Sequence, residues 1–250
     1  AIRRKDVLDF HARYYGPRGT VMVLVGAVEP QAALERVRRA LDDWSNPNQP
    51  PQVEFPAVAG MRGGVRRHLP LAGKAQTDLI IGTHGPQRKS PDYIPASLGN
   101  SVLGQFGMMG RIGAVVREQG GLAYDASTSL SAWIAGGSWE VSAGVNPANL
   151  QRVIDLILAE LARFVSQPVS AAELQDSQSN FIGRLPLSME SNAGVANALL
   201  NMERFDLGLD YYRLYPGLVA AVTPQIILDA AQRYLDLEKL AIISSGPELT

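Results

Sequence analysis

The side chains of this 250-residue chain that could carry out chemistry are few and widely spaced. Three histidines are present, His11, His68 and His84, and no cysteine, which excludes disulfides, thiol catalysis and cysteine-bound zinc. No histidine stands in an H-x-x-E-H or H-E-x-x-H arrangement, the spacings typical of helical zinc sites. The sequence also lacks a G-x-S-x-G nucleophile elbow. Taken alone, these residues do not build a complete active site.

One stretch, VVREQGGLAY at residues 115–124, carries an arginine and a tyrosine around two consecutive glycines. Arg117 precedes Tyr124 by seven residues, with Gly120 and Gly121 between them. The pattern predicts a helix that ends at a glycine hinge and is followed by a strand. Arg117 can simply stabilise the helix end, where positive charge is favourable, and Tyr124 can pack on a sheet. Residue types alone therefore favour a structural role for both.

The elements that must position this stretch are predicted from periodicity and turn residues. Strands are expected at 64–70 and 77–84, and a hairpin of two strands around Gly136 and Gly137. One helix is expected from Asp92 to about Gly104 and a second from about Met108 to Gln119. The glycines of GQFGMMG at 104–110 are expected to permit close packing or a turn, since no strand precedes them as in a dinucleotide fingerprint.

The C-terminal half reads as a series of capped helices followed by one strand. Asn146, Ser170 with Glu173, and Thr223 are expected to cap three helices, and Pro186 should kink or break the second. Further helices are expected near 192–206 and 210–221, and a final strand at LAIISSG, residues 240–246. The order of elements predicts an α+β fold with an antiparallel or mixed sheet covered on one face by helices.

The N-terminal part reads as a separate piece. A helix over KDVLDFHARYY, a buried strand over GTVMVLVGAV (19–28) and a helix over PQAALERVRRALDDW precede a Pro/Gly-rich linker at 51–62. The helix–strand unit VLDFHARYYGPRGTVMVLVG resembles the end of the chain, IILDAAQRYLDLEKLAIISSG. We therefore expect residues 1–50 to be the closing helix–strand–helix piece of a preceding domain, and residues 63–250 to form one domain.

Composition excludes several classes of partner. The net charge is −1, with 46% hydrophobic and 19% charged residues, which gives no general attraction to nucleic acid or to an anionic membrane. No apolar run approaches the roughly 20 residues that span a bilayer. We expect a soluble protein without a membrane span, in the cytoplasm or the periplasm.

GRIGAVVREQGGLAYDASTSL at residues 110–130 resembles a segment of the pitrilysin/insulinase-type (M16) zinc peptidases, in their C-terminal, non-zinc domain. The family pattern is a small residue, Arg, Leu, a short helix, LRE, a polar residue, GLAY and a strand. The chain matches it at Arg111, Arg117, Glu118, Gly121, Leu122, Ala123 and Tyr124. YYGPRGTVMVLVGAVEPQ, AAELQDSQ and LGLDYYRLYPGLVAAVTPQIILDAAQRYL resemble further family segments in the same order.

The resemblance implies a metallopeptidase M16 (LuxS/MPP-like) fold and a role in peptide hydrolysis. In that family two halves enclose an unfolded peptide; one supplies the zinc, and the other an Arg/Tyr pair that contacts the substrate backbone. Arg117 and Tyr124 would be this pair, catalytic and substrate-binding, with Gly121 as the hinge. A phenol donor could stabilise the oxyanion that forms when zinc-bound hydroxide attacks an amide.

The departure from the family is the absent zinc motif. The resemblance therefore implies no metal ligand in this chain, zinc in a missing half or a partner subunit, and no activity for the chain alone. The parent could be a catalytic chain or a zinc-less subunit that pairs with a catalytic one, as a homo- or heterodimer. The alternative function is a non-catalytic structural core subunit of the same fold that scaffolds a complex.

Overall fold

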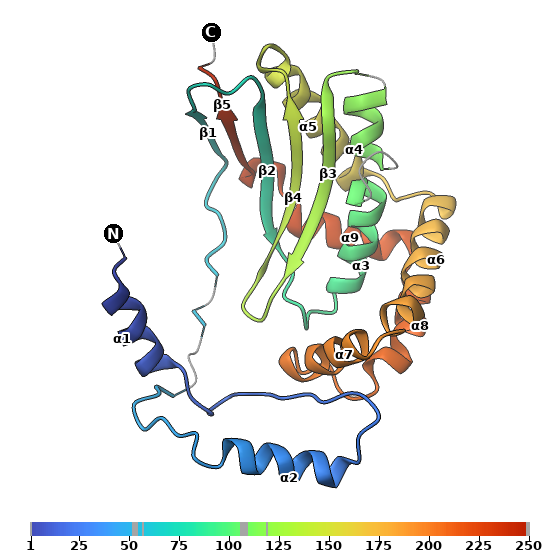
Figure 1. The fold of residues 1–250 in the computed structure, drawn as a ribbon. Helices are drawn as coiled ribbons and strands as arrows, with labels where there is room; N and C mark the ends of the chain where they lie inside the picture. Colours follow the sequence, from blue (N-terminus) through green and yellow to red (C-terminus); the bar gives the residue numbers. More distant parts are fainter. Residues whose placement is uncertain (1, 52–54, 57, 106–109, 119, 249–250) are drawn as a thin grey trace. The chain divides into compact units, whose positions relative to one another are not determined.

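The computed structural model describes residues 2–51, 55–56, 58–105, 110–118 and 120–248. Backbone contacts divide the chain into two compact units (Figure 1). The first unit combines Ala1–Pro56 with Pro186–Tyr211, and the second, here called the sheet unit, combines Ala57–Leu185 with Tyr212–Thr250. Each is described by itself.

The sheet unit is built on one five-stranded sheet with strand order β1-β5-β2-β4-β3. β1 is parallel to β5, and the other neighbouring pairs are antiparallel. The sheet is thus mixed, and the predicted strands and hairpin are confirmed. Their bounds are β1 (Val65–Pro70), β2 (Thr77–Gly85), β3 (Ala123–Ala132), β4 (Gly137–Val145) and β5 (Ala241–Gly246).

Helices cover one face of this sheet, as the predicted α+β fold requires (Figure 1). Alternate residues of β4, Trp139, Val141, Ala143 and Val145, are buried beneath them, whereas Ser142 on the other face is exposed. The α-helices are α3 (Tyr93–Asn100), α4 (Arg111–Gly113), α5 (Leu150–Ser166), α6 (Ala171–Ser188), α8 (Tyr211–Ala220) and α9 (Pro224–Tyr234). Two π-helical turns, η1 (Ser101–Gln105) and η3 (Ala114–Glu118), and two 3₁₀ turns, η4 (Pro147–Asn149) and η5 (Leu237–Lys239), complete the set.

The predicted caps are present. The Asn146 side chain accepts a hydrogen bond from the Ala148 amide at 3.0 Å, and Thr223 Oγ1 accepts one from the Ile226 amide at 3.3 Å. Ser170 and Glu173 form the reciprocal capping box at the start of α6. Pro186 lies inside α6, where it lacks the amide that would donate to the Ile182 carbonyl, and the helix ends two residues later at Ser188.

A polar contact inside the core fixes the end of α3. The indole of Trp139, 1% exposed, donates to the side-chain oxygen of Asn100 at 2.9 Å. The Thr128 hydroxyl donates to the Asn100 carbonyl at 3.0 Å. All three residues are buried. Their hydrogen bonds therefore avoid the free-energy cost of burying a polar group without a partner.

The first unit contains α1 (Arg4–Tyr14), α2 (Pro30–Leu41) and α7 (Asn192–Arg204). The prediction of a buried strand at 19–28 is wrong: residues 20–25 have no regular secondary structure, and Val21, Met22 and Leu24 are 47%, 51% and 53% exposed. A strand exists only by pairing, and the described part of this unit holds no other strand. The division at residues 51–62 into two domains stays a prediction.

Within the described residues, no single helix has both the length and the hydropathy to cross a membrane. Tyr211–Ala220 and Pro224–Lys239 satisfy that test only as a pair, with a 101° bend between them.

Candidate functional site

The helix that carries Arg117 begins at a close approach between two glycines. Gly104, at φ 152°, interrupts the π-helical turn η1, and a side chain on Gly110 would collide with the Gly104 backbone. This close approach confirms the packing role expected for these glycines. α4 and η3 then follow without a break, from Arg111 to Glu118.

Arg111, the first residue of this helix, is fixed by a carboxylate far away in sequence. Its Nε and one terminal nitrogen donate to the two oxygens of Glu173 at 2.7 and 2.8 Å, a bidentate pair. The hydrogen bond from Arg111 lowers the pKa of Glu173 to about 2, and the same bond raises the pKa of Arg111. Since Glu173 also caps α6, one carboxylate joins the start of α6 to the helix of Arg117.

A second carboxylate reinforces this junction from α5. Glu160 is buried, and its Oε1 lies 3.7 Å from a terminal nitrogen of Arg111, while its Oε2 pairs with Arg163 at 2.7 Å. The Arg111 guanidinium also lies 5.6 Å from the ring centre of Phe164. A cavity of about 240 Å³ borders the junction and is lined by Arg111, Glu173, Asp176, Ser177, Asn180, Ser101 and Val102.

Gly120 and Gly121 follow the helix, as the sequence predicts. Gly121 has φ 58°, in the left-handed region, and its amide donates to the Arg117 carbonyl at 2.9 Å. The next amide, of Leu122, donates to the Val116 carbonyl at 3.1 Å. This is the glycine-terminated helix end in which a residue at positive φ satisfies the last carbonyls. The chain then enters β3 at Ala123.

Arg117 is exposed on the last turn before this glycine, and Tyr124 lies at a bulge in β3. The register shifts between Ala123, which pairs with Val145, and Asp125, which pairs with Gly144. A bulge re-aims side chains locally, as at many functional sites. The side chain of Tyr124 lies outside the described residues, so the expected pairing of the two side chains stays a prediction.

β3 is an edge strand, and its sheet has one open face. Asp125, Ser129 and Ser142 are exposed there, and the hydroxyl oxygens of Ser127 and Ser142 lie 3.2 Å apart. The serines of β3 thus lie on the face away from the core. Unpaired backbone groups on an edge strand can accept an extended peptide as a further strand.

Two of the histidines have local partners. His11 is exposed on α1 and stacks on Tyr15 at 4.8 Å between ring centres. His68 is held by the Ser244 hydroxyl and the Pro247 carbonyl, each at 2.9 Å. In the described ranges, no group of three or more His, Asp or Glu side chains could hold a metal ion.

Sequence reasoning missed the partners of Arg111. The Ser170–Glu173 spacing indicated a capping box, but nothing local indicates that Glu173 also binds an arginine 62 residues earlier. The burial of Glu160 has a faint signal, since it falls among the apolar positions of α5. It is a charge on the inward face of an amphipathic helix, and such a residue needs a buried partner.

A family model described as the peptidase M16 inactive domain matches residues 1–181. No curated protein matches the sequence. The peptidase M16 inactive domain of Pseudomonas fluorescens matches in structure over 100% of this chain and 59% of that chain, with a TM-score of 0.88 and 24% identity. A Helicobacter pylori protease matches over 98% of this chain and 60% of its own, with a TM-score of 0.87 and 18% identity.

A chain of complex III2 from Candida albicans also has this fold. It matches over 98% of this chain and 59% of its own length, with a TM-score of 0.74 and 14% identity. At these identities the structural matches show the fold, and the chain spans about three fifths of the length of each relative.

Proposed function

Since the chain belongs to the M16 peptidase family, as a member of its inactive-domain group, we propose that it forms the substrate-binding, zinc-free side of an M16-type peptidase. In this role Arg117 and Tyr124 contact the backbone of an enclosed peptide beside the scissile bond. The zinc and its ligands come from another half of the protein or from a partner subunit.

The observation that carries the proposal is the junction of the Arg117 helix with the edge strand. Arg111, Glu173 and Glu160 fix the start of the helix, and Gly121 fixes its end. Arg117 is therefore an exposed guanidinium on a rigid support, and it can donate several hydrogen bonds to carbonyl oxygens. The strand that follows is the edge strand of the described sheet, and an edge strand can pair with an extended peptide.

The alternative function is a structural core subunit that holds a complex together and cleaves nothing. The similarity to a chain of complex III2 brings this role into consideration. The two functions differ in what Arg117 and Tyr124 must do, because a scaffold needs neither the phenol nor the guanidinium. Substitution of these two residues therefore separates them.

The test uses the assembled enzyme, with its zinc-bearing half or subunit, and an unstructured peptide whose cleavage is followed by chromatography. Tyr124→Phe should lower kcat by about 10²–10³, the usual cost of one oxyanion donor, without a change in Tm. Arg117→Lys should also lower kcat, because lysine keeps the charge and loses the planar fork.

Two exposed residues of the first unit provide matched controls. Tyr15→Phe and Arg36→Lys make the same chemical changes on α1's flank and on α2, and should leave turnover unchanged. Normal turnover in both site variants would instead favour the scaffold. A lower Tm for Tyr124→Phe would indicate that the side chain of Tyr124 has a packing role.

We also infer that residues 1–50 close a preceding domain of the same type. The support is the similarity in sequence between residues 7–26 and the segment 226–246 of α9 and β5, together with exposure: no residue of α1 or α2 is buried. β5 lies between β1 and β2 in its sheet, so the related run at 20–25 would take an inner position in another sheet.

A further inference from the structure

The helix α1 and the helix α9 correspond to each other residue by residue, 220 positions apart. α1 runs from Arg4 to Tyr14 and α9 from Pro224 to Tyr234, so both of their ends agree at this offset. At the same offset the run 21–26 corresponds to β5. The residues that are identical in the two copies are Leu8, Asp9, Arg13, Tyr14 and Gly26, which match Leu228, Asp229, Arg233, Tyr234 and Gly246. The second copy therefore serves as a template for the surroundings of the first.

The helix of the second copy is buried against the rest of the sheet unit. Ile227 and Leu228 are 1% and 8% exposed. Ile227 lies against α3, where a Cβ on Gly99 would come within 3.1 Å of it. The corresponding residues of α1, Val7 and Leu8, are 58% and 48% exposed. Among the described residues, this face of α1 therefore lacks the cover that α3 gives to α9.

The run 21–26 lacks its neighbours in the same way. β5 is an inner strand, parallel to β1 and antiparallel to β2. Residues 21–25 pair with no strand in the part of the chain that the structure describes. Met22 and Leu24 are 51% and 53% exposed, although the residues that correspond to them in β5 face the core. A strand at 21–26 therefore needs two strands from outside the described structure.

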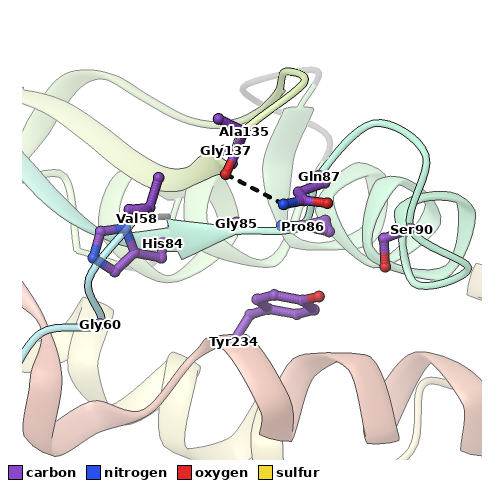
Figure 2. A pocket seen from close by; sticks show the side chains of 11 residues that line it. Val58, Gly60, His84, Gly85, Pro86, Gln87, Ser90, Ala135, Gly137 and Tyr234 are labelled. Carbon is purple, nitrogen blue, oxygen red and sulfur yellow. Dashed lines mark hydrogen bonds between the residues drawn. The ribbon is translucent and has the colours of Figure 1, made fainter. Parts of the chain in front are cut away.

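Arg233 and Tyr234, at the end of α9, share one carboxylate. Arg233 donates to Oδ2 of Asp92 at 2.5 Å, and the Tyr234 hydroxyl donates to the same oxygen at 3.0 Å. Asp92 immediately precedes α3, so this contact joins the end of α9 to the start of α3. The Tyr234 ring rises from α9 towards the residues that follow β2 (Figure 2). The two side chains thus form a receptor with two donors for one carboxylate.

Arg13 and Tyr14 repeat this pair at the end of α1. Both are exposed, and in the described ranges neither forms an ion pair or a hydrogen bond with a carboxylate through its side chain. The Arg13 guanidinium lies 5.3 Å from the centre of the Tyr14 ring, and the Phe10 ring lies 4.7 Å from it. An available guanidinium and phenol beside an exposed apolar face suit a partner that covers the face and carries a carboxylate at its rim.

The structural relatives are long enough to supply this partner within one polypeptide. This chain spans 59% and 60% of the Pseudomonas fluorescens and Helicobacter pylori proteins. The remaining two fifths of each is close in length to the segment 63–225, which surrounds the second copy in this chain. A preceding segment of the same polypeptide is therefore favoured over a second copy of the chain.

We propose that α1 and the run 21–26 dock into a preceding sheet-and-helix unit of the same polypeptide, where Arg13 and Tyr14 bind one carboxylate at the start of a helix. The run 21–26 enters the sheet of that unit as an inner strand. The proposal rests on the closing role inferred above for residues 1–50, and it does not require the peptidase role.

The test compares the 250-residue chain with the complete product of its gene, by hydrogen exchange and mass spectrometry of peptic peptides. In the complete product the amides of 21–25 should exchange at least about a hundredfold more slowly, because an inner strand exchanges only when the unit opens. Equal exchange in the two proteins, or a gene that encodes no preceding unit, would overturn the proposal. A dimer of the 250-residue chain with slow exchange at 21–25 would also overturn it, because the partner would then be a second copy.

Variants of the complete gene product test the carboxylate contact. Arg13→Gln and Tyr14→Phe should each speed exchange at 21–25 by about fivefold or more, since each removes a hydrogen bond to a charged group at a partly exposed site. Arg13→Lys keeps the charge and should retain part of the protection. Arg36→Gln, exposed on α2, is the matched control and should leave exchange unchanged. Unchanged exchange in Arg13→Gln or in Tyr14→Phe would overturn the carboxylate contact.

Two further readouts separate this proposal from others. Exchange at β4, measured in the same samples, should stay slow in every variant, which shows that the sheet unit remains folded. Slow exchange at 21–25 together with normal turnover in Tyr124→Phe would support the docking and contradict the peptidase role. Fast exchange at 21–25 in a complete gene product whose turnover depends on Tyr124 would overturn the docking alone.

Discussion

Glu173 is the residue on which most of the site's rigidity depends, because it serves Arg111 and the start of α6 at once. Glu173→Gln keeps the size of the side chain and removes the charge that both partners require. Hydrogen bonds to charged groups contribute about 1.5–3 kcal/mol, and this side chain is 32% exposed, so screening reduces the value. We expect the free energy of unfolding to fall by about 1–2 kcal/mol in urea titrations at pH 7. The control variant Glu35→Gln on α2 should leave the free energy of unfolding unchanged.

The same residue predicts a pH dependence. The pKa of Glu173 is lowered from its ordinary 4.5 to about 2, so the ionised form stabilises the folded state above about pH 4.5. That contribution is lost as the pH falls through 4.5 towards 2, because the carboxylate is then protonated in the unfolded chain. The difference between the original protein and Glu173→Gln should therefore shrink over this range. A constant difference from pH 7 to pH 3 would contradict the ion pair.

At the scale of elements, Gly121 sets where the Arg117 helix ends. Gly121→Ala would place a Cβ in the left-handed region and should cost about 1 kcal/mol. The matched control is Gly183→Ala in the interior of α6, where a Cβ meets nothing within 4 Å and φ is not positive. That change should stabilise by about 0.4–1 kcal/mol. Thermal melts of both variants measure these two effects. Stabilisation of both variants would show that the helix does not need a glycine at position 121.

How far the sequence predicts each element depends on whether its cause is local. Caps at Asn146, Ser170 and Thr223 and the glycines of the hairpin are local signals, so their elements were predicted correctly. The strand predicted at 19–28 was wrong because an apolar, β-branched run has only a tendency to form a strand. A strand also needs a neighbouring strand to pair with. The π-helical turns and the Arg111–Glu173 pair depend on contacts between distant segments, which one sequence does not reveal.

At the scale of the whole molecule, the sheet unit has a hydrophobic core made of its own residues. Its cluster of buried apolar side chains runs from Leu79 to Leu240. Deletion of residues 1–50 should therefore leave 63–250 with a single cooperative melting transition in calorimetry. Disappearance of that transition would show that the two parts share one core.

The whole chain should also carry no metal of its own. After incubation with zinc and dialysis, metal analysis should find well below one zinc per chain, because the described residues offer no ligand cluster. A structural zinc protein treated in parallel provides the positive control. One tightly held zinc per chain, or peptide cleavage by the chain alone, would refute the proposed division of roles.

The burial of Trp139 has an optical consequence. Its indole is 1% exposed and bonded to Asn100, while Trp44 in the first unit and Trp133 at the β3–β4 turn are 37% and 55% exposed. An indole in a dry core emits ultraviolet fluorescence at shorter wavelength than one in water. With Trp44 and Trp133 replaced by phenylalanine, the emission colour of the protein would report only the interior of the sheet unit. With Trp44 alone retained, the emission would report the first unit. The unfolding of each unit can therefore be followed separately.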